Sequence, residues 1–269
     1  MKTGRLPGIR GLTLAYLLSG MALASGAAGA SPTVGPSPAP SPAGAGAASE
    51  PVAGLRPFEA SYSWSWHGAT VAISTLKLEH RDGEHWTYSS SGEPRGIGYL
   101  YPIHPALVSQ LRVTAEGVQP LSFKADAGSA SRNADVTFDW AGGRVTGNYE
   151  GVTLDMASTP GLQDDLSVQV ALMVDLLRDQ PPETLWMLDK NAVRDYRYRR
   201  EGTERIDTPF GPIDTVIYSS QHPGSPRVTR FWCAPSKGYL PMRVEQKRLD
   251  SVEWTMKVRT LQFGSPGSH

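Results

Sequence analysis

Cysteine is nearly absent from this sequence: Cys233 is the single cysteine in 269 residues. One cysteine excludes an internal disulfide, so burial of apolar side chains must hold the folded chain together. A nucleophilic cysteine needs a helix N-terminus or a neighbouring imidazole to lower its thiol pKa. The segment Phe231-Trp232-Cys233-Ala234-Pro235 offers neither and matches no signature of a cysteine enzyme. We therefore interpret Cys233 as a small apolar residue of the scaffold.

Other catalytic signatures are also missing. The sequence has no GxSxG or SxxK motif, no P-loop, no glycine-rich dinucleotide motif and no HExxH. His80 and His85 flank a predicted turn that holds Asp82 and Glu84, which leaves a surface metal site or a solvated hairpin tip as interpretations. The hairpin tip is favoured because this spacing matches no structural zinc pattern. We predict no catalytic residue, no metal ligand and no cofactor, and expect that the protein is not an enzyme.

An excess of charge of one sign is lacking as well, since 26 basic residues balance 26 acidic ones. The first thirty residues hold three of the basic residues and no acid, so their removal leaves 23 basic against 26 acidic residues. A chain with this balance has no electrostatic footprint for nucleic acid or for an anionic membrane. We expect no nucleic-acid partner.

Long hydrophobic runs are absent too. Leu12–Leu23 is too short to span a bilayer comfortably, and three basic residues precede it. Ala28-Gly29-Ala30 then fits a signal-peptidase site, so residues 1–30 are predicted to be a cleaved Sec-type signal peptide. Cleavage after Ala24 also fits the pattern, and an uncleaved N-terminal anchor is the alternative. The prediction is an exported, periplasmic protein whose mature form has no transmembrane segment.

Apolar bulk is scarce in residues 31–56, which are nearly all Ser, Pro, Ala and Gly. Such a segment cannot offset the entropy of ordering it, so we predict a disordered linker. One globular domain is then expected over residues 57–263, with a flexible tail at 264–269.

Period-two alternation dominates the predicted domain. In FEASYSWSWHG, residues 58–68, Tyr62, Trp64 and Trp66 share one face while serines share the other. Similar segments recur between Gly, Pro, Asp and Asn turn signals, and together they predict about a dozen short strands. This pattern predicts a mainly β fold, a single antiparallel curved sheet or open barrel.

One segment has helical periodicity instead. Leu166, Val170, Met173, Val174 and Leu177 form an apolar stripe, and Pro181-Pro182 ends it. We predict one amphipathic helix that lays this stripe on the sheet, because the stripe has nowhere else to be buried. Asp164 and Asp165 near its start are either a carboxylate pair or residues favoured by the helix dipole, and the dipole already explains them.

The aromatic row Tyr62, Trp64 and Trp66 is the most suggestive feature for function. A core strand seldom needs two tryptophans on one face, because each buried indole N–H requires a partner. The row is therefore either core or the lining of a groove for an acyl chain, a glycan or an apolar peptide. Trp254 and Met256 on the last predicted strand are further candidates for this groove.

The sequence resembles a family of exported bacterial proteins, domain of unknown function 3108. Six ordered features carry the resemblance: Phe58-x-Ala60-x-Tyr62, Tyr101-Pro102, Phe138-Asp139-Trp140, Gln163-Asp164-x-Leu166-Ser167, Thr208-Pro209-x-Gly211, and Trp232-x-Ala234-Pro235 with Tyr239-Leu240-Pro241-x-Arg243. The resemblance implies an envelope location and a β-rich fold, similar to the half-barrel of periplasmic lipoprotein carriers, but no activity.

Two functions follow as hypotheses. The first is a non-enzymatic binding or carrier module that takes a lipid or other amphipathic ligand in the cell envelope. The second is an accessory factor of envelope assembly that holds a protein partner through a sheet edge or the aromatic face. The row Tyr62, Trp64 and Trp66 is the predicted ligand groove under the first.

Overall fold

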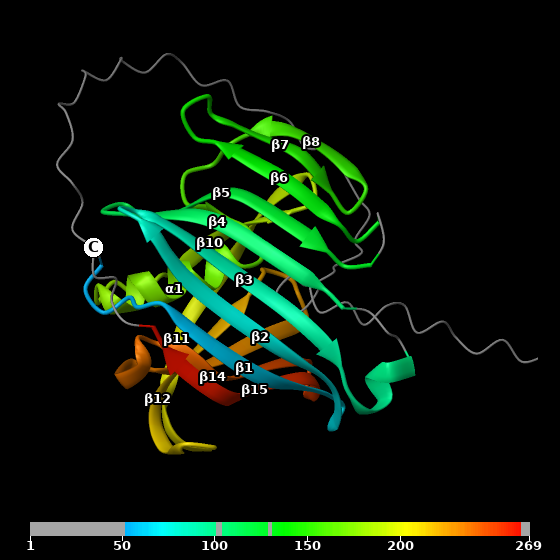
Figure 1. The fold of residues 1–269 in the computed structure, drawn as a ribbon, viewed down its shortest axis with the longest axis vertical. Helices are drawn as coiled ribbons and strands as arrows, with labels where there is room; N and C mark the ends of the chain where they lie inside the picture. Colours follow the sequence, from blue (N-terminus) through cyan, green and yellow to red (C-terminus); the bar gives the residue numbers. More distant parts are fainter. Residues whose placement is uncertain (1–51, 101–103, 129–130, 265–269) are drawn as a thin grey trace, which may run out of the picture.

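The computed structural model describes residues 52–100, 104–128 and 131–264 (Figure 1). The predicted signal peptide, residues 31–51 of the predicted linker and residues 265–269 of the predicted tail lie outside the described residues. Strand β1 begins at Phe58 and strand β15 ends at Phe263.

The described residues form one sheet of 15 strands and one α-helix. The strands are β1 Phe58–Trp66, β2 Ala69–Asp82, β3 His85–Pro94, β4 Ala106–Thr114, β5 Gly117–Asp126, β6 Ala134–Asp139, β7 Arg144–Tyr149, β8 Val152–Ala157, β9 Leu162–Gln163, β10 Thr184–Asp189, β11 Ala192–Thr208, β12 Gly211–Gln221, β13 Arg227–Ala234, β14 Leu240–Arg248 and β15 Ser251–Phe263. The helix is α1 Ser167–Leu177, and two short 3-10 helices are η2 Gly96–Leu100 and η3 Pro235–Lys237. The predicted curved sheet with one helix is confirmed, although 15 strands exceed the predicted dozen.

The first and last strands lie together in the middle of the sheet. The order is β8-β7-β6-β5-β4-β3-β2-β1-β15-β14-β13-β12-β11-β10-β9, and each pair is antiparallel except β9 with β10. Register shifts interrupt several ladders, including β1 with β2 and β4 with β5. Such bulges bend strands and increase their twist, which helps a sheet of this width to curl. Figure 1 shows the strands curling around α1.

The helix is buried almost all round, which differs from the predicted amphipathic stripe. Val168, Ala171, Leu172 and Leu176 are buried in addition to the stripe, whereas Leu177 is only partly buried. A helix that is apolar on every side belongs inside a core and not on its surface. The sheet therefore wraps the helix, which packs against β5 and β9.

The sheet curls far enough to bring β9, at one end of the strand order, against β5, but the two ends of the sheet do not join. Strand β9 packs near β5, and the Gln163 side-chain amide donates to the Val118 carbonyl oxygen at 2.8 Å. The two strands at the ends of the order, β8 and β9, do not pair with each other. The fold is thus an unclosed, barrel-like sheet.

Candidate ligand-binding face

Strand pairing gathers the predicted row at one end of the sheet. Strand β1 pairs with β15, so Trp64 lies opposite Met256 and Trp66 opposite Trp254. We call this the mouth end, where β1 ends at Trp66. The opposite end, where β1 begins at Phe58 and β4 ends at Thr114, is the far end.

Trp64 of the row and Trp254 of strand β15 are both buried, and both indoles have hydrogen-bond partners. Trp64 is 8% exposed and Trp254 6%, and their ring centroids lie 5.2 Å apart. Trp64 Nε1 donates to Ser74 Oγ at 2.7 Å, and Trp254 Nε1 donates to Gln246 Oε1 at 3.0 Å. Each indole thus has the partner that burial demands.

The other predicted groove residues differ in exposure. Tyr62 is fully buried and donates its hydroxyl proton to the Pro241 carbonyl oxygen at 3.1 Å, and Met256 is also buried. Trp66 is only partly buried and meets the His67 ring edge-on. The row therefore runs from the interior toward the mouth end. Its role in ligand binding stays a prediction.

The helix lies toward the other end of the concave face. Asp164, just before α1, accepts a hydrogen bond from Ser109, and Arg178, just after α1, donates to the Thr114 carbonyl oxygen at the far end. Ser109 and Phe58 share one ladder row through Tyr88 and Leu78. Trp64 is six residues beyond Phe58 toward the mouth end, or about 20 Å along the strand. An 11-residue helix, about 16 Å long, therefore fills the far half of the concave face.

Polar side chains accompany the indoles on this inner face. Ser74, Thr229 and Gln246 are buried, and Gln246 Nε2 donates to Thr229 Oγ1 at 3.2 Å. The sequence interpretation missed them. The alternation Met242, Val244, Gln246 was the available signal, since residues two apart on a strand face the same side. The mouth half thus combines large aromatic rings with a few fixed polar groups, the composition usual for small-molecule sites.

One buried hydroxyl on the inner face has no partner. Tyr88 is fully buried, and within the described part of the chain its hydroxyl makes no hydrogen bond. Burial raises the pKa of Tyr88, with a contribution from nearby Tyr62. The neutral hydroxyl is both a donor and an acceptor, and buried hydroxyls normally find a partner.

Cys233 lies in the same interior and is fully buried. Burial raises the pKa of its thiol far above the ordinary value, so the thiol stays protonated at neutral pH. A buried, protonated thiol is a packing group and not a nucleophile.

The segment Gln163–Ser167 fixes the start of the helix to the sheet. Asp164 Oδ1 accepts the backbone N–H groups of Leu166 and Ser167 at 2.8 Å each, and its Oδ2 accepts the Ser109 hydroxyl at 2.6 Å. Burial raises the pKa of Asp164, although these hydrogen bonds oppose the rise. Asp165 accepts the Tyr149 hydroxyl at 2.5 Å. The two carboxylates thus bind different strands, and they tie the start of the helix to β4 and β7.

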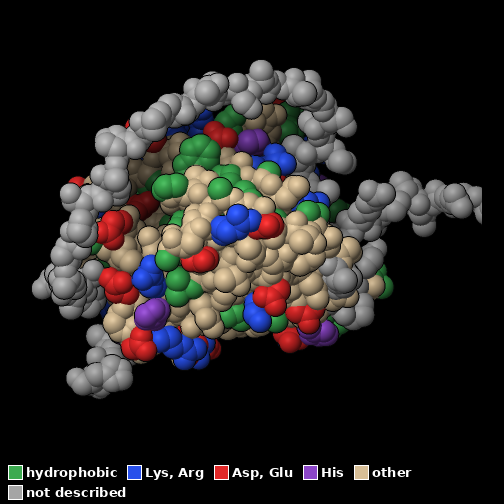
Figure 2. Space-filling view, turned by 90° about the horizontal axis from the view of Figure 1, so that it is seen from above, with side chains coloured by type: hydrophobic (Ala, Val, Ile, Leu, Met, Phe, Trp, Pro, Cys, Tyr) green, Lys and Arg blue, Asp and Glu red, His purple; other side chains and the backbone are tan. Residues whose placement is uncertain are grey.

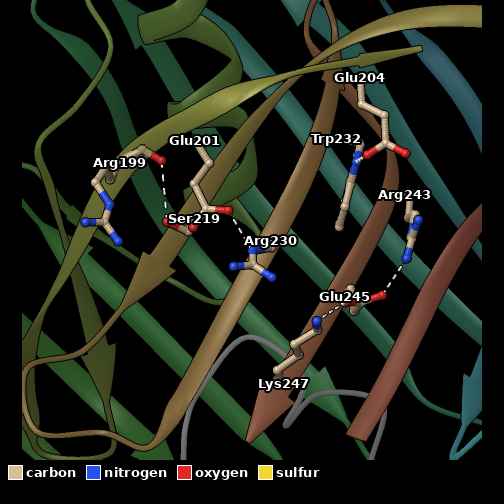
Figure 3. A network of polar contacts seen from close by, with 9 residues as sticks. All are labelled: Arg199, Glu201, Glu204, Ser219, Arg230, Trp232, Arg243, Glu245 and Lys247. Atoms are coloured by element: carbon tan, nitrogen blue, oxygen red, sulfur yellow. Dashed lines mark hydrogen bonds and ion pairs between the residues drawn. The ribbon is translucent and has the colours of Figure 1, made fainter. Parts of the chain in front are cut away.

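A charged network covers the opposite face of strands β11–β14 (Figure 3). Trp232 Nε1 donates to Glu204 at 2.7 Å, and the Arg243 guanidinium stacks 4.3 Å from the Trp232 ring centroid. Arg243 also pairs with Glu245 at 2.5 Å. Figure 3 joins Arg230 to Glu201, Trp232 to Glu204, and Arg243 and Lys247 to Glu245. Packing of the outer face therefore accounts for Trp232 and Arg243.

Figure 2 shows basic and acidic side chains interspersed over one face of the molecule. The hairpin tip holds His80, which contacts the Gly83 carbonyl oxygen at 2.8 Å, and His85, which contacts Asp82 at 2.9 Å. Within the described residues no three His, Cys, Asp or Glu side chains are grouped to hold a metal ion. The helix that the structure describes is too short to cross a membrane.

Comparison with known proteins gives a family and a fold. The sequence model of a family of proteins of unknown function, DUF3108, matches residues 58–257. No curated protein matches the chain. A crystal structure of a β-barrel-like DUF1849 protein from Brucella abortus is similar with a TM-score of 0.52 and 11% identity, and the match covers 78% of this chain and 99% of that one.

Two further solved structures are less similar. A candidate exported protein with a YmcC-like fold from Bacteroides fragilis has a TM-score of 0.36 at 11% identity, over 77% of this chain and 96% of that one. A candidate lipoprotein from Parabacteroides distasonis has a TM-score of 0.35 at 11% identity, over 78% and 96%.

Proposed function

The chain belongs to the DUF3108 family, and from that premise we propose that it is a non-enzymatic binding or carrier module of the cell envelope. The ligand is apolar or amphipathic, and it binds on the concave face at the mouth end. The signal-peptide pattern of residues 1–30 supports export to the periplasm.

The observation that carries the proposal is the composition of the mouth half of the concave face, beyond the helix. Trp64, Trp254 and Met256 supply apolar area there, and Ser74 and Gln246 fix the two indole rings through hydrogen bonds. Both rings are buried, so an acyl chain or similar group would enter between them, and rings held in this way would give it a rigid wall.

The Tyr88 hydroxyl supports an amphipathic rather than a purely apolar ligand. It is buried on the ladder row of Ser109 and Phe58, close to Tyr62 of the aromatic row, and it lacks a partner among the described residues. A ligand with a polar group would satisfy it, whereas a hydrocarbon would leave its desolvation uncompensated. The buried Cys233 thiol supports the non-enzymatic part of the proposal.

A titration with a long-chain fatty acid, monitored by tryptophan fluorescence, tests the proposal. We expect the emission of the wild-type chain to shift and saturate. Trp254→Phe should weaken binding by about tenfold or more, because it replaces the fixed indole with a smaller ring that cannot donate to Gln246. Trp140→Phe is the matched control, because Trp140 also donates its indole N–H, to the Pro120 carbonyl oxygen at 2.6 Å, but lies at the far end. Absence of any shift in the wild type, or equal weakening in both variants, contradicts the proposal.

A second function, an accessory factor that holds a protein partner, has one observation in its favour. Strand β8 ends the sheet and pairs only with β7, which leaves one edge of its six residues open within the described fold. An open edge is a template for strand addition. Co-purification of one stoichiometric protein, with no bound lipid, would favour this function over the first.

A further inference from the structure

The unpaired hydroxyl of Tyr88 lies at the inner end of the aromatic row. Tyr88 is opposite Leu78 in the β2–β3 ladder, and Leu78 is opposite Phe58 in the β1–β2 ladder. The Tyr88 ring meets the Phe58 ring edge-on, with 6.1 Å between the centroids. Tyr62, the next member of the row, is near enough to add to the raised pKa of Tyr88. The hydroxyl is therefore enclosed among rings and aliphatic groups on the inner face.

Polar neighbours of this hydroxyl are engaged elsewhere. Ser109 lies directly opposite Tyr88 in the β3–β4 ladder, but its hydroxyl donates to Asp164 at 2.6 Å. The Tyr62 hydroxyl donates to the Pro241 carbonyl oxygen. A trapped water needs about two to four polar partners, and the surrounding rings and aliphatic groups offer none. A ligand that brings one polar group on an apolar chain suits such surroundings better.

The interior beside Tyr88 holds carboxylates but no cation. Asp164 accepts two backbone N–H groups and the Ser109 hydroxyl, which is the hydrogen-bond pattern of an ionised carboxylate. Asp165 accepts the Tyr149 hydroxyl. Over residues 52–100, 104–128 and 131–264, no lysine, arginine or histidine side chain is buried.

This distribution of charge discriminates among polar groups of a ligand. An anionic group at Tyr88 would lose its hydration without gaining a cationic partner, and it would lie one residue from the Asp164 carboxylate. A cationic group would gain little, because donors from the protein already hold both interior carboxylates. A neutral hydroxyl or carbonyl meets neither obstacle and supplies the hydrogen bond that Tyr88 lacks.

We propose that the ligand is a neutral amphiphile whose hydroxyl or ester carbonyl binds Tyr88, while its apolar chain runs along the row toward the mouth end. Trp64 and Trp66 follow Tyr62 in that direction on the same strand, so they would line the chain. This inference rests on the proposed function and deepens it by naming the ligand class. Long-chain alcohols and esters belong to that class, and ionised fatty acids do not.

Four probes of one chain length test the ligand class: dodecanol, methyl dodecanoate, dodecanoate and dodecylammonium. Each is titrated against the full chain at neutral pH and followed by tryptophan fluorescence. The two neutral probes should bind at least about tenfold more tightly than either ion, because burial of an unpaired charge is costly. Dodecanoate should still saturate the site at higher concentration, since its chain buries the same apolar area.

Tyr88→Phe tests the position of the polar group. It should weaken binding of the two neutral probes by about three- to tenfold and leave dodecanoate unchanged, because only the neutral probes use the hydroxyl. Tyr198→Phe is the matched control, since the Tyr198 side chain forms a hydrogen bond with Ser220 and also packs against the core. It should keep the wild-type preference for neutral probes. Melting curves verify that both variants are folded.

Infrared spectroscopy of bound methyl dodecanoate, isotope-labelled at its carbonyl, gives a second readout. A hydrogen bond from Tyr88 weakens the C=O bond, so the carbonyl stretch should lie at lower frequency in the wild type than in Tyr88→Phe. Equal frequencies in the two proteins would overturn the contact. This readout does not depend on affinity, so it holds even where a variant changes stability.

Three binding results overturn the inference while the proposed function survives. Dodecanoate that binds as tightly as dodecanol would show that the polar end is not buried at Tyr88. Tighter binding of dodecylammonium would place that end at the interior carboxylates. Equal affinities of Tyr88→Phe and the wild type for every probe would mean that the hydroxyl holds only a water. By contrast, absence of saturation by all four probes defeats the proposed function itself.

Discussion

At the scale of the residue, the interior holds two kinds of polar group. Ser74 and Gln246 each accept an indole N–H, so they stabilise the packed rings. Tyr88 instead keeps a buried hydroxyl that no described residue engages. A polar atom retained at such a cost points to function more than to stability.

Tyr88→Phe separates these two roles. The substitution removes a buried, unpaired hydroxyl and keeps the ring, so the free energy of unfolding should stay level or rise by about 1 kcal/mol. Affinity for an amphipathic ligand should fall, because the ligand loses its polar contact. Thermal melting and the fluorescence titration measure the two effects. A variant that melts several degrees lower with unchanged affinity would show that the hydroxyl is structural.

At the scale of the element, α1 carries a carboxylate whose position makes folding depend on pH. Asp175 lies near the C-terminus of the helix, and burial raises its pKa to about 6, although Arg178 opposes the rise. The negative end of the helix dipole also disfavours its ionised form. The folded chain therefore holds this proton more tightly than the unfolded chain does.

Asp175→Asn should reveal that dependence. The wild type loses stability as pH rises from about 4, the ordinary pKa, to about 6, and the variant lacks this loss. Because the side chain is partly exposed, the difference at pH 7 should be of order 1 kcal/mol in favour of the variant. Melting temperatures of both proteins between pH 4 and 7 provide the measurement. Parallel curves for the two proteins would mean that Asp175 titrates normally.

Sequence periodicity predicted the helix and most strands, and two of the missed strands, β5 and β9, have physical reasons. Strand β5 pairs with β4 through a register shift between Gln110 and Leu111 of β4. Within β5, the buried side chains lie at even-numbered positions up to Pro120 and at odd-numbered positions from Phe123, so no single alternation runs through the strand. Strand β9 has only two residues, which is too short for any period. The helix was predicted to be amphipathic because only one stripe was counted, whereas a curled sheet offers apolar surroundings on all sides.

The candidate site was only partly accessible from the sequence. Alternation placed Tyr62, Trp64 and Trp66 on one face, but alternation does not fix strand order. The pairing of β1 with β15, which brings Trp254 to Trp66, required the structure. The exposure of Tyr99, Leu100 and Leu249 was not predicted, because a short apolar segment without period does not reveal its exposure.

At the scale of the whole molecule, the proposed function rests on an unequal division of the concave face. The sheet curls around a helix that lies toward the far end, which leaves the mouth end to aromatic rings and hydrogen-bonded polar groups. Exposed apolar side chains, among them Leu100 and Leu249, border that same end.

Mass spectrometry of the organic extract from natively purified protein tests the central claim most directly. We predict one class of amphipathic molecule at close to one per chain in the wild type. Tyr88→Phe and Trp254→Phe should carry less of it, and Trp140→Phe should carry as much as the wild type. An extract with no bound amphipathic molecule, or with the same amount in all four proteins, would contradict the account.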